Sequence, residues 1–306
     1  MKTEQGKSRD QNQLKLDRRR LFSGLAVGLY GLVVVGLGGW WFTAALCVIV
    51  QLALLEFFRM AKFKGIRPAT KTTMVACQLL LISTQWGYAG GLPAQLSAAI
   101  LPLSGAAICG WLLLQPVTGS IADIAASIFG LFYLGFLPSH WLKLRNLNNV
   151  ELAQSLHKLP DQLVMWLSSG LLITFSACLM IVAFDIGSYV LGKRFGKLPL
   201  SPISPGKTIE GALGGLLCSM IIGVISGVLL SWPFGLLLGG FLGCFVALFA
   251  LVGDLTESMM KRDAGLKDSG ELLPGHGGIL DRIDSYLFTP AVIYYVVTLI
   301  IPLLNS

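Results

Sequence analysis

Long apolar stretches alternate with short polar segments along almost the whole chain. Nine of these stretches have the length of a membrane-spanning helix, which needs about 20 residues to cross a bilayer. They lack the regular alternation of apolar and polar residues that marks a membrane β-barrel, so the pattern predicts an all-α, polytopic membrane protein. The predicted spans are residues 20–37, 38–59, 71–89, 92–114, 120–140, 164–190, 210–231, 233–255 and 286–304.

The composition agrees with this class. Hydrophobic residues make up 54% of the 306 residues and charged residues only 13%, whereas a soluble domain of this size needs a polar exterior. The six cysteines all lie in the apolar stretches and form no C-x-x-C pair. We therefore interpret them as small packing residues, not as disulfide partners or metal ligands.

Lysine and arginine are distributed unevenly between the two sides that nine crossings define. If the N-terminus is cytoplasmic, 20 of the 23 Lys and Arg residues fall on the cytoplasmic side. This is the asymmetry that the positive-inside rule describes. We therefore predict that the N-terminus and the charged loops face the cytoplasm. The formal net charge of +7 reflects this topology, not a nucleic-acid partner.

The same pattern divides the chain into three parts. The N-terminal tail is basic, but its Glu4, Asp10 and Asp17 argue against an organellar transit peptide. Since no long extension precedes the first apolar stretch, we expect a multi-pass protein of a bacterial inner (plasma) membrane. The three parts are a cytoplasmic tail (1–20), about five N-terminal membrane helices (21–160) and a C-terminal catalytic membrane region (161–306) with cytoplasmic loops at 191–210 and 255–286.

One segment gathers much of the chain's charge. In "KRDAGLKDSGELLPGHGGILDRID", residues 261–284, nine of 24 positions are charged and five are glycine. A solvated basic loop would account for the Lys and Arg residues. It would not account for acids at both membrane junctions, Asp254 on one side and Asp281 and Asp284 on the other. An acid near the hydrocarbon is costly unless it is paired or binds a cation.

These residue types indicate a chemistry. Carboxylates at the ends of two neighbouring helices are suitable oxygen ligands for Mg²⁺, which binds few carboxylates together with substrate phosphates. Lys and Arg bind polyphosphate oxygens, and glycines let backbone N–H groups approach an anion. If the preceding helix continues, Asp254, Ser258 and Lys261 share one face of it. The pattern predicts metal-assisted phosphoryl or nucleotidyl transfer at the membrane surface.

The second charged loop contains "SPGKT", which resembles the end of a phosphate-binding Walker A loop. That motif needs Gly at the position of Ser201, so we reject it. We predict instead a helix that begins with Ser204 as N-cap and Pro205 at the first helical position. Lys207 and Thr208 would then make an anion site at the helix N-terminus.

The charged segment resembles the signature of phosphatidate cytidylyltransferase, also called CDP-diacylglycerol synthase. The upstream "FDIGSY", "GKRFGK" and "ISPGKTIEG" resemble a second block of that family, except that Gly206 stands where the family has Lys. The resemblance covers about the C-terminal 125 residues. The matching signature residues are Ser258, Lys261, Arg262, Lys267, Asp268, Gly270, Pro274, His276, Gly277, Gly278, Asp281, Arg282 and Asp284.

The resemblance implies the reaction of CTP with phosphatidate to give CDP-diacylglycerol and pyrophosphate, with Mg²⁺ as cofactor. A second cation beside it is our own hypothesis. The resemblance also implies a metal role for Asp254 and Asp281, and we add Asp284 and Asp185 as candidate ligands. The predicted catalytic residues are Lys261, Arg262, Lys267, Asp268, His276 and Arg282. The predicted substrate-binding residues are Ser204, Lys207, Thr208, Ser258, Gly277 and Gly278.

Several alternatives stay open at this point. A CTP-dependent lipid kinase of the polyprenol or phytol type would release CDP instead of pyrophosphate. A transporter would need acids at membrane depth, but here they cluster towards one face and no inverted repeat is visible. The expected partners are the two substrates and membrane lipid, and a homodimer is an open alternative. Elsewhere, Glu56 and Arg59 lie within one helical turn, and we expect them to pair.

Overall fold

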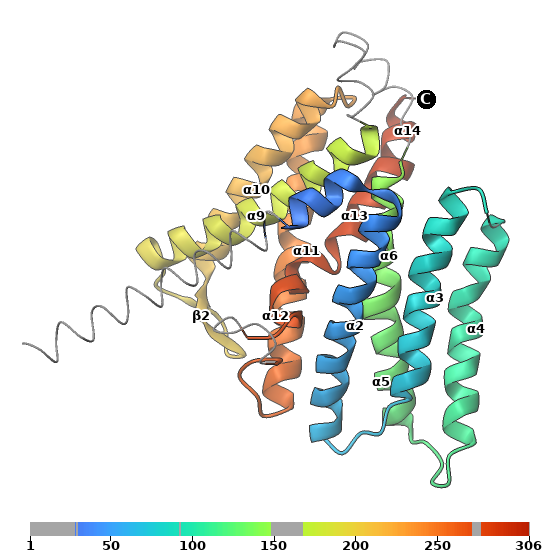
Figure 1. The fold of residues 1–306 in the computed structure, drawn as a ribbon. Coiled ribbons are helices and arrows are strands. Elements are labelled where there is room, and N and C mark those ends of the chain that lie inside the picture. The colour runs from blue at the N-terminus through green and yellow to red at the C-terminus, as the bar shows by residue number, and fades with distance from the viewer. Residues whose placement is uncertain (1–27, 29, 92, 148–167, 271–276, 306) are drawn as a thin grey trace, which may run out of the picture.

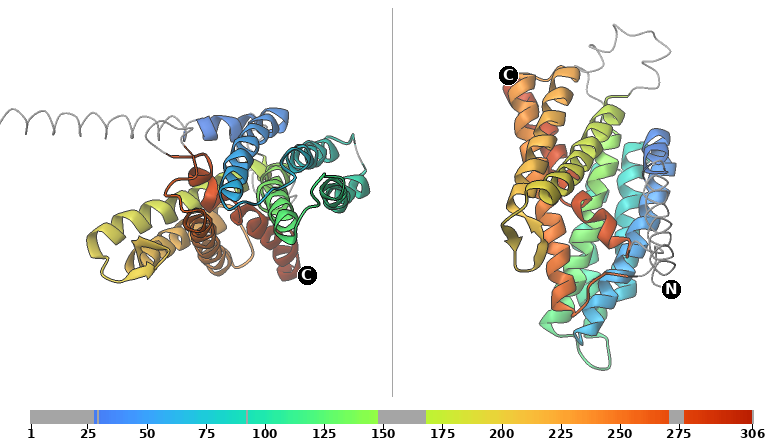
Figure 2. Two further views of the ribbon diagram at one scale, coloured as in Figure 1. Left: turned by 90° about the horizontal axis from the view of Figure 1, so that it is seen from below. Right: turned by 90° about the vertical axis from the view of Figure 1, so that its left-hand side faces the viewer.

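The computed structural model describes residues 28, 30–91, 93–147, 168–270 and 277–305. Apart from one short β-hairpin, the regular structure of these residues is helical. In Figure 1 the helices within residues 39–145 and the helix Gly235–Asp263 have roughly parallel axes, whereas the helices Ser169–Phe195 and Ile209–Leu229 cross them at a steep tilt. Figure 2 shows the same helices from two further sides. The all-α membrane class that we predicted from the apolar pattern is therefore confirmed.

The N-terminal half is a row of antiparallel helices. Helix α2 packs against α3, and α3 packs against α4 and against a continuous rod that is made of α5, a π-helical turn η1, and α6 (Figure 1). The bounds are α2 Gly39–Phe63, α3 Thr70–Tyr88, α4 Ala94–Leu113, α5 Ile121–Leu131, η1 Phe132–Phe136 and α6 Leu137–Arg145.

The C-terminal half contains three long helices and a broken final rod. Helices α9 and α10 lie side by side and are joined by the β1–β2 hairpin, and α11 packs against α10 (Figure 1). The bounds are α9 Ser169–Phe195, β1 Pro199–Ser201, β2 Ser204–Thr208, α10 Ile209–Leu229, α11 Gly235–Asp263, α12 Leu280–Ile283, η2 Asp284–Tyr286, α13 Thr289–Tyr295, η3 Val296–Ile300 and α14 Ile301–Asn305.

Six helices within the described residues are long and apolar enough to cross a membrane, so the predicted count of nine is not confirmed. Helix α3 occupies a predicted span, but its Thr, Ser and Gln residues make it more polar than the others. The apolar part of α4, Ala98–Leu113, is shorter. Half of the first predicted span, 20–37, falls outside the described residues, and residues 30–37 are helical. The six helices are Gly39–Phe63, Ile121–Arg145, Ser169–Phe195, Ile209–Leu229, Gly235–Asp263 and Leu280–Leu304.

Glycine determines how closely the C-terminal helices approach. A Cβ atom on Gly215 of α10 would lie 2.5 Å from the Phe184 carbonyl oxygen of α9, and one on Gly223 would overlap the Gly239 carbonyl oxygen of α11. A Cβ atom on Gly253 of α11 would likewise overlap the Asp284 carbonyl oxygen of η2. These contacts leave no room for a side chain, so the small residues allow α9, α10, α11 and η2 to pack closely.

The helix ends alternate between two sides of the bundle. Helices α2 and α11 end on the same side, where Lys64 and Asp263 form an ion pair of 3.1 Å. Figure 1 shows the loop after α4 and the loop after α11 on this lower side, and the α10–α11 turn at the opposite side. The predicted loops 191–210 and 255–286 are shorter than we expected, because α9 and α11 continue to Phe195 and Asp263.

Candidate active site

Three acids from two elements form a cluster near the lower end of α11. Asp254 and Glu257 lie about one turn apart on α11, and Asp284 comes from η2, which Gly253 allows to pack closely. One carboxylate oxygen from each acid lies within 4.8 Å of the other two. The predicted end of this helix at residue 255 is wrong, because α11 continues to Asp263. The continuation gives Asp254, Ser258 and Lys261 the common helix that their shared face required, and it places Glu257 beside Asp254.

The donor atoms of this cluster fit a hard divalent cation. All three are carboxylate oxygens, which Mg²⁺ prefers. Glu257 is only 1% exposed, and its Oε1 has no hydrogen-bond partner in the described part of the chain. A buried carboxylate oxygen without a partner is costly, and coordination would remove that cost. Asp185 of α9 approaches the same region and accepts a hydrogen bond of 3.3 Å from the Ser285 hydroxyl.

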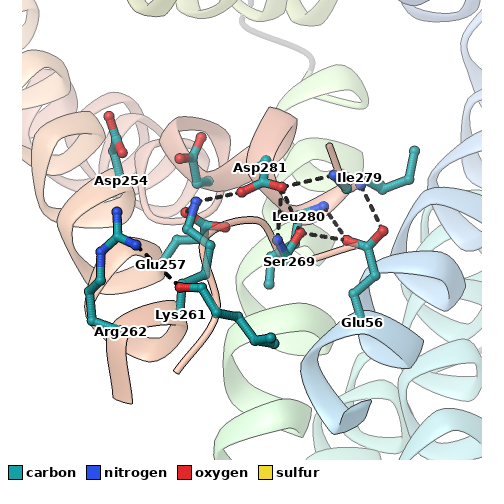
Figure 3. Close-up of polar contacts among 12 residues, drawn as sticks. Glu56, Asp254, Glu257, Lys261, Arg262, Ser269, Ile279, Leu280 and Asp281 are labelled. Atoms are coloured by element: carbon teal, nitrogen blue, oxygen red, sulfur yellow. Dashed lines mark hydrogen bonds and ion pairs between the residues drawn. The ribbon is translucent and has the colours of Figure 1, made fainter. Parts of the chain in front are cut away.

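Two lysines from different elements pair with acids of the cluster. Lys207 of β2 forms an ion pair with Asp254. Lys261 lies one turn after Glu257 on α11 and pairs with its Oε2 at 2.6 Å. The same ammonium group also donates to Asp281 Oδ1 at 2.5 Å. Lys261 therefore joins the acidic cluster to the segment that re-enters the bundle (Figure 3).

Asp281 is held by several donors at once. Its Oδ2 accepts hydrogen bonds from the Ser269 backbone (3.0 Å) and the Gly278 backbone (2.8 Å), and it lies 2.9 Å from the Ser269 hydroxyl, whose single proton it shares with Glu56 Oε2. Gly277 has a φ of +79°, and a Cβ atom there would lie 2.8 Å from the same oxygen. The glycines thus allow the backbone to wrap around a carboxylate of the protein itself. Asp281 is not part of the group of three acids that contains Asp254.

The predicted helix start at Ser204 is wrong. Residues 204–208 form strand β2, which pairs with β1 through Ser201 and Ser204. Helix α10 begins at Ile209, and Thr208 is its N-cap, with its hydroxyl accepting a hydrogen bond from the Gly211 N–H at 3.2 Å. Proline is compatible with a short edge strand as well as with a first helical turn, so the Ser-Pro pattern did not decide between them.

The other predicted site residues surround the cluster without joining it. Ser258 is buried on α11, and Arg262 donates to the Ile203 carbonyl of the hairpin at 3.4 Å. Gly278 contributes the backbone donor to Asp281 described above. The exposed members are Lys267, Asp268 and Arg282, and those outside the described residues are Pro274 and His276.

Two acids of the site were missed or misread in the sequence. Glu257 lies three residues after Asp254 and four before Lys261, and this spacing would have placed it on their helix face. Glu56 was expected to pair with Arg59. It instead accepts hydrogen bonds from the Ser269 hydroxyl and from the backbone N–H groups of residues 279 and 280, each at 2.9 Å (Figure 3). No local pattern reveals this contact, because the partners lie in the other half of the chain.

Comparison with protein families matches residues 18–300 to the cytidylyltransferase family. The chain belongs to this family. A phosphatidate cytidylyltransferase of Synechocystis is 48% identical over 279 residues, which is 88% of this chain and 92% of the relative. Phosphatidate cytidylyltransferase 4, chloroplastic, of Arabidopsis thaliana is 38% identical over 304 residues, 94% of this chain and 74% of the relative. A phosphatidate cytidylyltransferase of Bacillus subtilis is 29% identical over 288 residues, 92% of this chain and 98% of the relative.

Membership of the family covers the N-terminal half as well, where the sequence alone had shown only apolar helices. The chain is therefore a membrane-embedded nucleotidyltransferase. Signature residues that are separated by the loop between Asp263 and Leu280 meet in space at α11, η2 and the segment that precedes α12.

Proposed function

We propose that this chain transfers the cytidylyl group of CTP to phosphatidate. An oxygen of the phosphatidate phosphate attacks the α-phosphorus of CTP. A new P–O–P bond forms, the bond between the α-phosphorus and its bridging oxygen to the β-phosphorus breaks, and pyrophosphate leaves with that electron pair. The products are CDP-diacylglycerol and pyrophosphate. This activity agrees with the names of the relatives that match most of the chain.

One observation carries the proposal. Acids and lysines from α11, η2 and β2 converge at one end of helices that are apolar enough to cross a membrane. A lipid phosphate and a water-soluble nucleotide can meet only at such a boundary, because acyl chains stay in the bilayer and CTP stays in water. The chemical difficulty is that one phosphate anion must attack another.

Asp254, Glu257 and Asp284 would hold the Mg²⁺ that the family resemblance implies. Bound there, the ion would supply positive charge to the triphosphate and to the charge that develops on the leaving group. The Lys side chains beside the cluster would also supply positive charge to the phosphates. We assign Lys207 and Lys261 to bind phosphate oxygens beside the cluster, since both already pair with its carboxylates. Asp185 is our candidate ligand for a second cation.

Asp281 has a different task in this proposal from the one that we predicted. Oδ2 accepts two backbone hydrogen bonds and contacts the Ser269 hydroxyl, while Oδ1 pairs with Lys261. Asp281 therefore orients the lysine and the loop between Asp263 and Leu280, here called the signature loop. Arg262, Lys267 and Arg282 are exposed at the surface around this loop, and we assign them to the departing pyrophosphate and its approach from water.

We also propose that the site faces the cytoplasm of a bacterial cell and that the chain crosses its plasma membrane nine times. The proposal is supported by the distribution of 20 of the 23 Lys and Arg residues to one side in that topology. This orientation would put the site in the cytoplasm, the compartment in which CTP is made. Helices α3 and α4 complete the row of the N-terminal half and would be two of the nine crossings.

The test is a reaction with purified protein, phosphatidate, CTP labelled in the base, and Mg²⁺. We expect labelled CDP-diacylglycerol and one pyrophosphate for each lipid formed. Release of labelled CDP with a phosphorylated lipid would instead identify a lipid kinase. Flux of a solute through liposomes without any nucleotide would identify a transporter.

In the same assay, Asp254→Asn should lower turnover roughly a hundredfold or more, because one ligand charge is lost where transition-state charge is stabilised. Glu257→Gln should act in the same direction and raise the Mg²⁺ concentration that half-saturates the enzyme. Thr256→Val is the matched control on the same helix, since that hydroxyl donates to the Val252 carbonyl of its own helix at 2.7 Å. Normal turnover of both acid variants would remove the metal assignment.

A further inference from the structure

We infer that Glu56, on helix α2 of the N-terminal half, is a positioning residue for Lys261. The inference rests on the proposed cytidylyl transfer. Glu56 is 4% exposed and lies among apolar side chains of α2. A carboxylate in such a place is costly unless its oxygens are bonded. Its donors come from the signature loop, not from its own helix.

The carboxylate fixes two points of that loop. Oε1 accepts a hydrogen bond from the Ile279 N–H and Oε2 accepts one from the Leu280 N–H, each at 2.9 Å. These N–H groups open the short helix α12, which begins at Leu280 and carries Asp281 as its second residue. Oε2 also accepts a hydrogen bond of 2.9 Å from the Ser269 hydroxyl. One side chain therefore bonds to the chain on both sides of the loop, at residue 269 and at residues 279 and 280.

A chain of polar contacts leads from Glu56 to the acidic cluster. The Ser269 hydroxyl lies 2.9 Å from Glu56 Oε2 and 2.9 Å from Asp281 Oδ2. Asp281 Oδ1 receives the Lys261 ammonium group at 2.5 Å, and Lys261 in turn pairs with Glu257. Figure 3 shows the order of these groups, with Ser269 between the two carboxylates. A shift of Glu56 would thus move the partner that orients Lys261.

The loop is shaped to admit this carboxylate. A Cβ atom on Gly270 would lie 2.5 Å from Glu56 Oε1, and one on Gly278 would overlap Oε2. Both glycines are buried. Close contact with Glu56 is therefore enough to explain why two positions of the signature are glycine, without any contact between them and a substrate.

The central test compares Glu56→Gln with the wild type in the CTP assay. The amide keeps the size of the side chain, but its NH₂ group faces one of the two backbone donors and cannot accept from it. We expect kcat to fall about 10- to 100-fold and the KM for CTP to stay unchanged. This is the usual range for residues that hydrogen-bond to a functional side chain without contacting the substrate themselves. Glu56→Asp keeps the charge but is too short to reach both donors, and its kcat should lie between those of Glu56→Gln and the wild type.

The matched control is Gln51→Leu, on the same helix. Gln51 accepts a hydrogen bond of 3.0 Å from the Gln78 amide of α3, so the substitution removes a polar contact between helices without touching the signature loop. Its kcat should equal that of the wild type. An equal loss of kcat in Gln51→Leu and Glu56→Gln would show a general effect on the bundle and overturn the inference.

A second measurement does not depend on activity. Hydrogen exchange at the Ile279 and Leu280 amides should be about tenfold faster or more in Glu56→Gln than in the wild type, because the bonds to the carboxylate are weakened or lost. Ser269→Ala should leave these amides protected yet lower kcat, and its effect should not add to that of Glu56→Gln. Additive effects of the two variants on kcat would contradict the contact chain.

The outcomes separate the two proposals. An active wild type together with unchanged kcat in Glu56→Gln would overturn the positioning role and leave the proposed function standing. An inactive wild type would overturn the proposed function and the catalytic part of this inference with it. Unchanged exchange at Ile279 and Leu280 would overturn the anchoring role of Glu56 in either case.

Discussion

Lys261 is shared by two acids that come from different elements. It lies one helical turn after Glu257 on α11 and pairs with Asp281 of α12. Its side chain is 12% exposed, and those of Glu257 and Asp281 are 1% and 11% exposed. The folded protein depends on this lysine, because two nearly buried carboxylates share its charge. Removing one member of a buried ion pair leaves an uncompensated charge.

Lys261→Met therefore tests both stability and chemistry. The substitution roughly keeps the length of the side chain and leaves Glu257 and Asp281 without their cation. We expect the free energy of unfolding to fall by about 3 kcal/mol and turnover of CTP to be lost. Lys261→Arg retains the charge and should keep most of the stability. Thermal unfolding in detergent and the CTP assay measure the two effects, and a Met variant as stable as the wild type would contradict the pairing.

At the scale of the residue, the sequence indicated which residue types form the site but not which of them contact one another. The spacing of Asp254, Ser258 and Lys261 indicated a shared helix face if the helix continued, and α11 does continue through all three. The contact between Lys261 and Asp281 depends on how the intervening loop folds back, which no periodicity encodes. Glu56 is more remote still. A basic residue one turn away in its own helix suggested a local pair, whereas the carboxylate bonds to the signature loop.

At the scale of the element, helix α11 connects the site to the packing of the bundle. It carries Asp254, Glu257 and Lys261 on one stretch, and Gly253 next to them gives η2 the room to bring Asp284 alongside. The apolar pattern predicted this helix, although the helix continues well beyond its predicted end at 255. The error has a physical reason, since the last turns of α11 carry charged residues, and Lys261 and Arg262 make polar contacts with Asp281 of α12 and with the hairpin.

Gly253→Ala tests this connection. The added methyl group would overlap the Asp284 carbonyl oxygen and must push η2 away from α11. A displacement of about 1 Å at a catalytic group can cost roughly a hundredfold in rate, so we expect a loss of that order in the CTP assay. Gly110→Ala in α4 is the control, because nothing lies within 4 Å of its Cβ position. Equal activity of both variants would show that Asp284 tolerates the shift.

At the scale of the whole molecule, the arrangement separates two kinds of surface. The membrane helices expose apolar side chains, as for Leu213, Leu217 and Ile221 of α10. The charged site lies near the ends of the helices, beside the hairpin and the signature loop. A lipid substrate can thus stay in the bilayer while its head group reaches the acids. The helical class could be predicted from composition and run length, whereas the number of crossings could not, because α3 is apolar enough for a bundle yet too polar for a clear span.

Labelling from the two sides of the membrane tests the proposed orientation. Gly206 on the hairpin and Ser231 in the α10–α11 turn are both exposed and lie at opposite ends of α10. In a variant without the six native cysteines, an impermeant maleimide should label Ser231→Cys in intact cells. Gly206→Cys should react only in inverted vesicles, and the reverse pattern would place the site on the outer face.

Every residue of the signature lies in the C-terminal half, yet Glu56 supports it from helix α2. A polypeptide shortened to residues 169–306 would keep the whole signature but lose the hydrogen bonds that Glu56 makes to it. Possession of the motif is therefore a poor criterion for a working enzyme in truncated genes. A minimal synthetic version of this protein has to include helix α2.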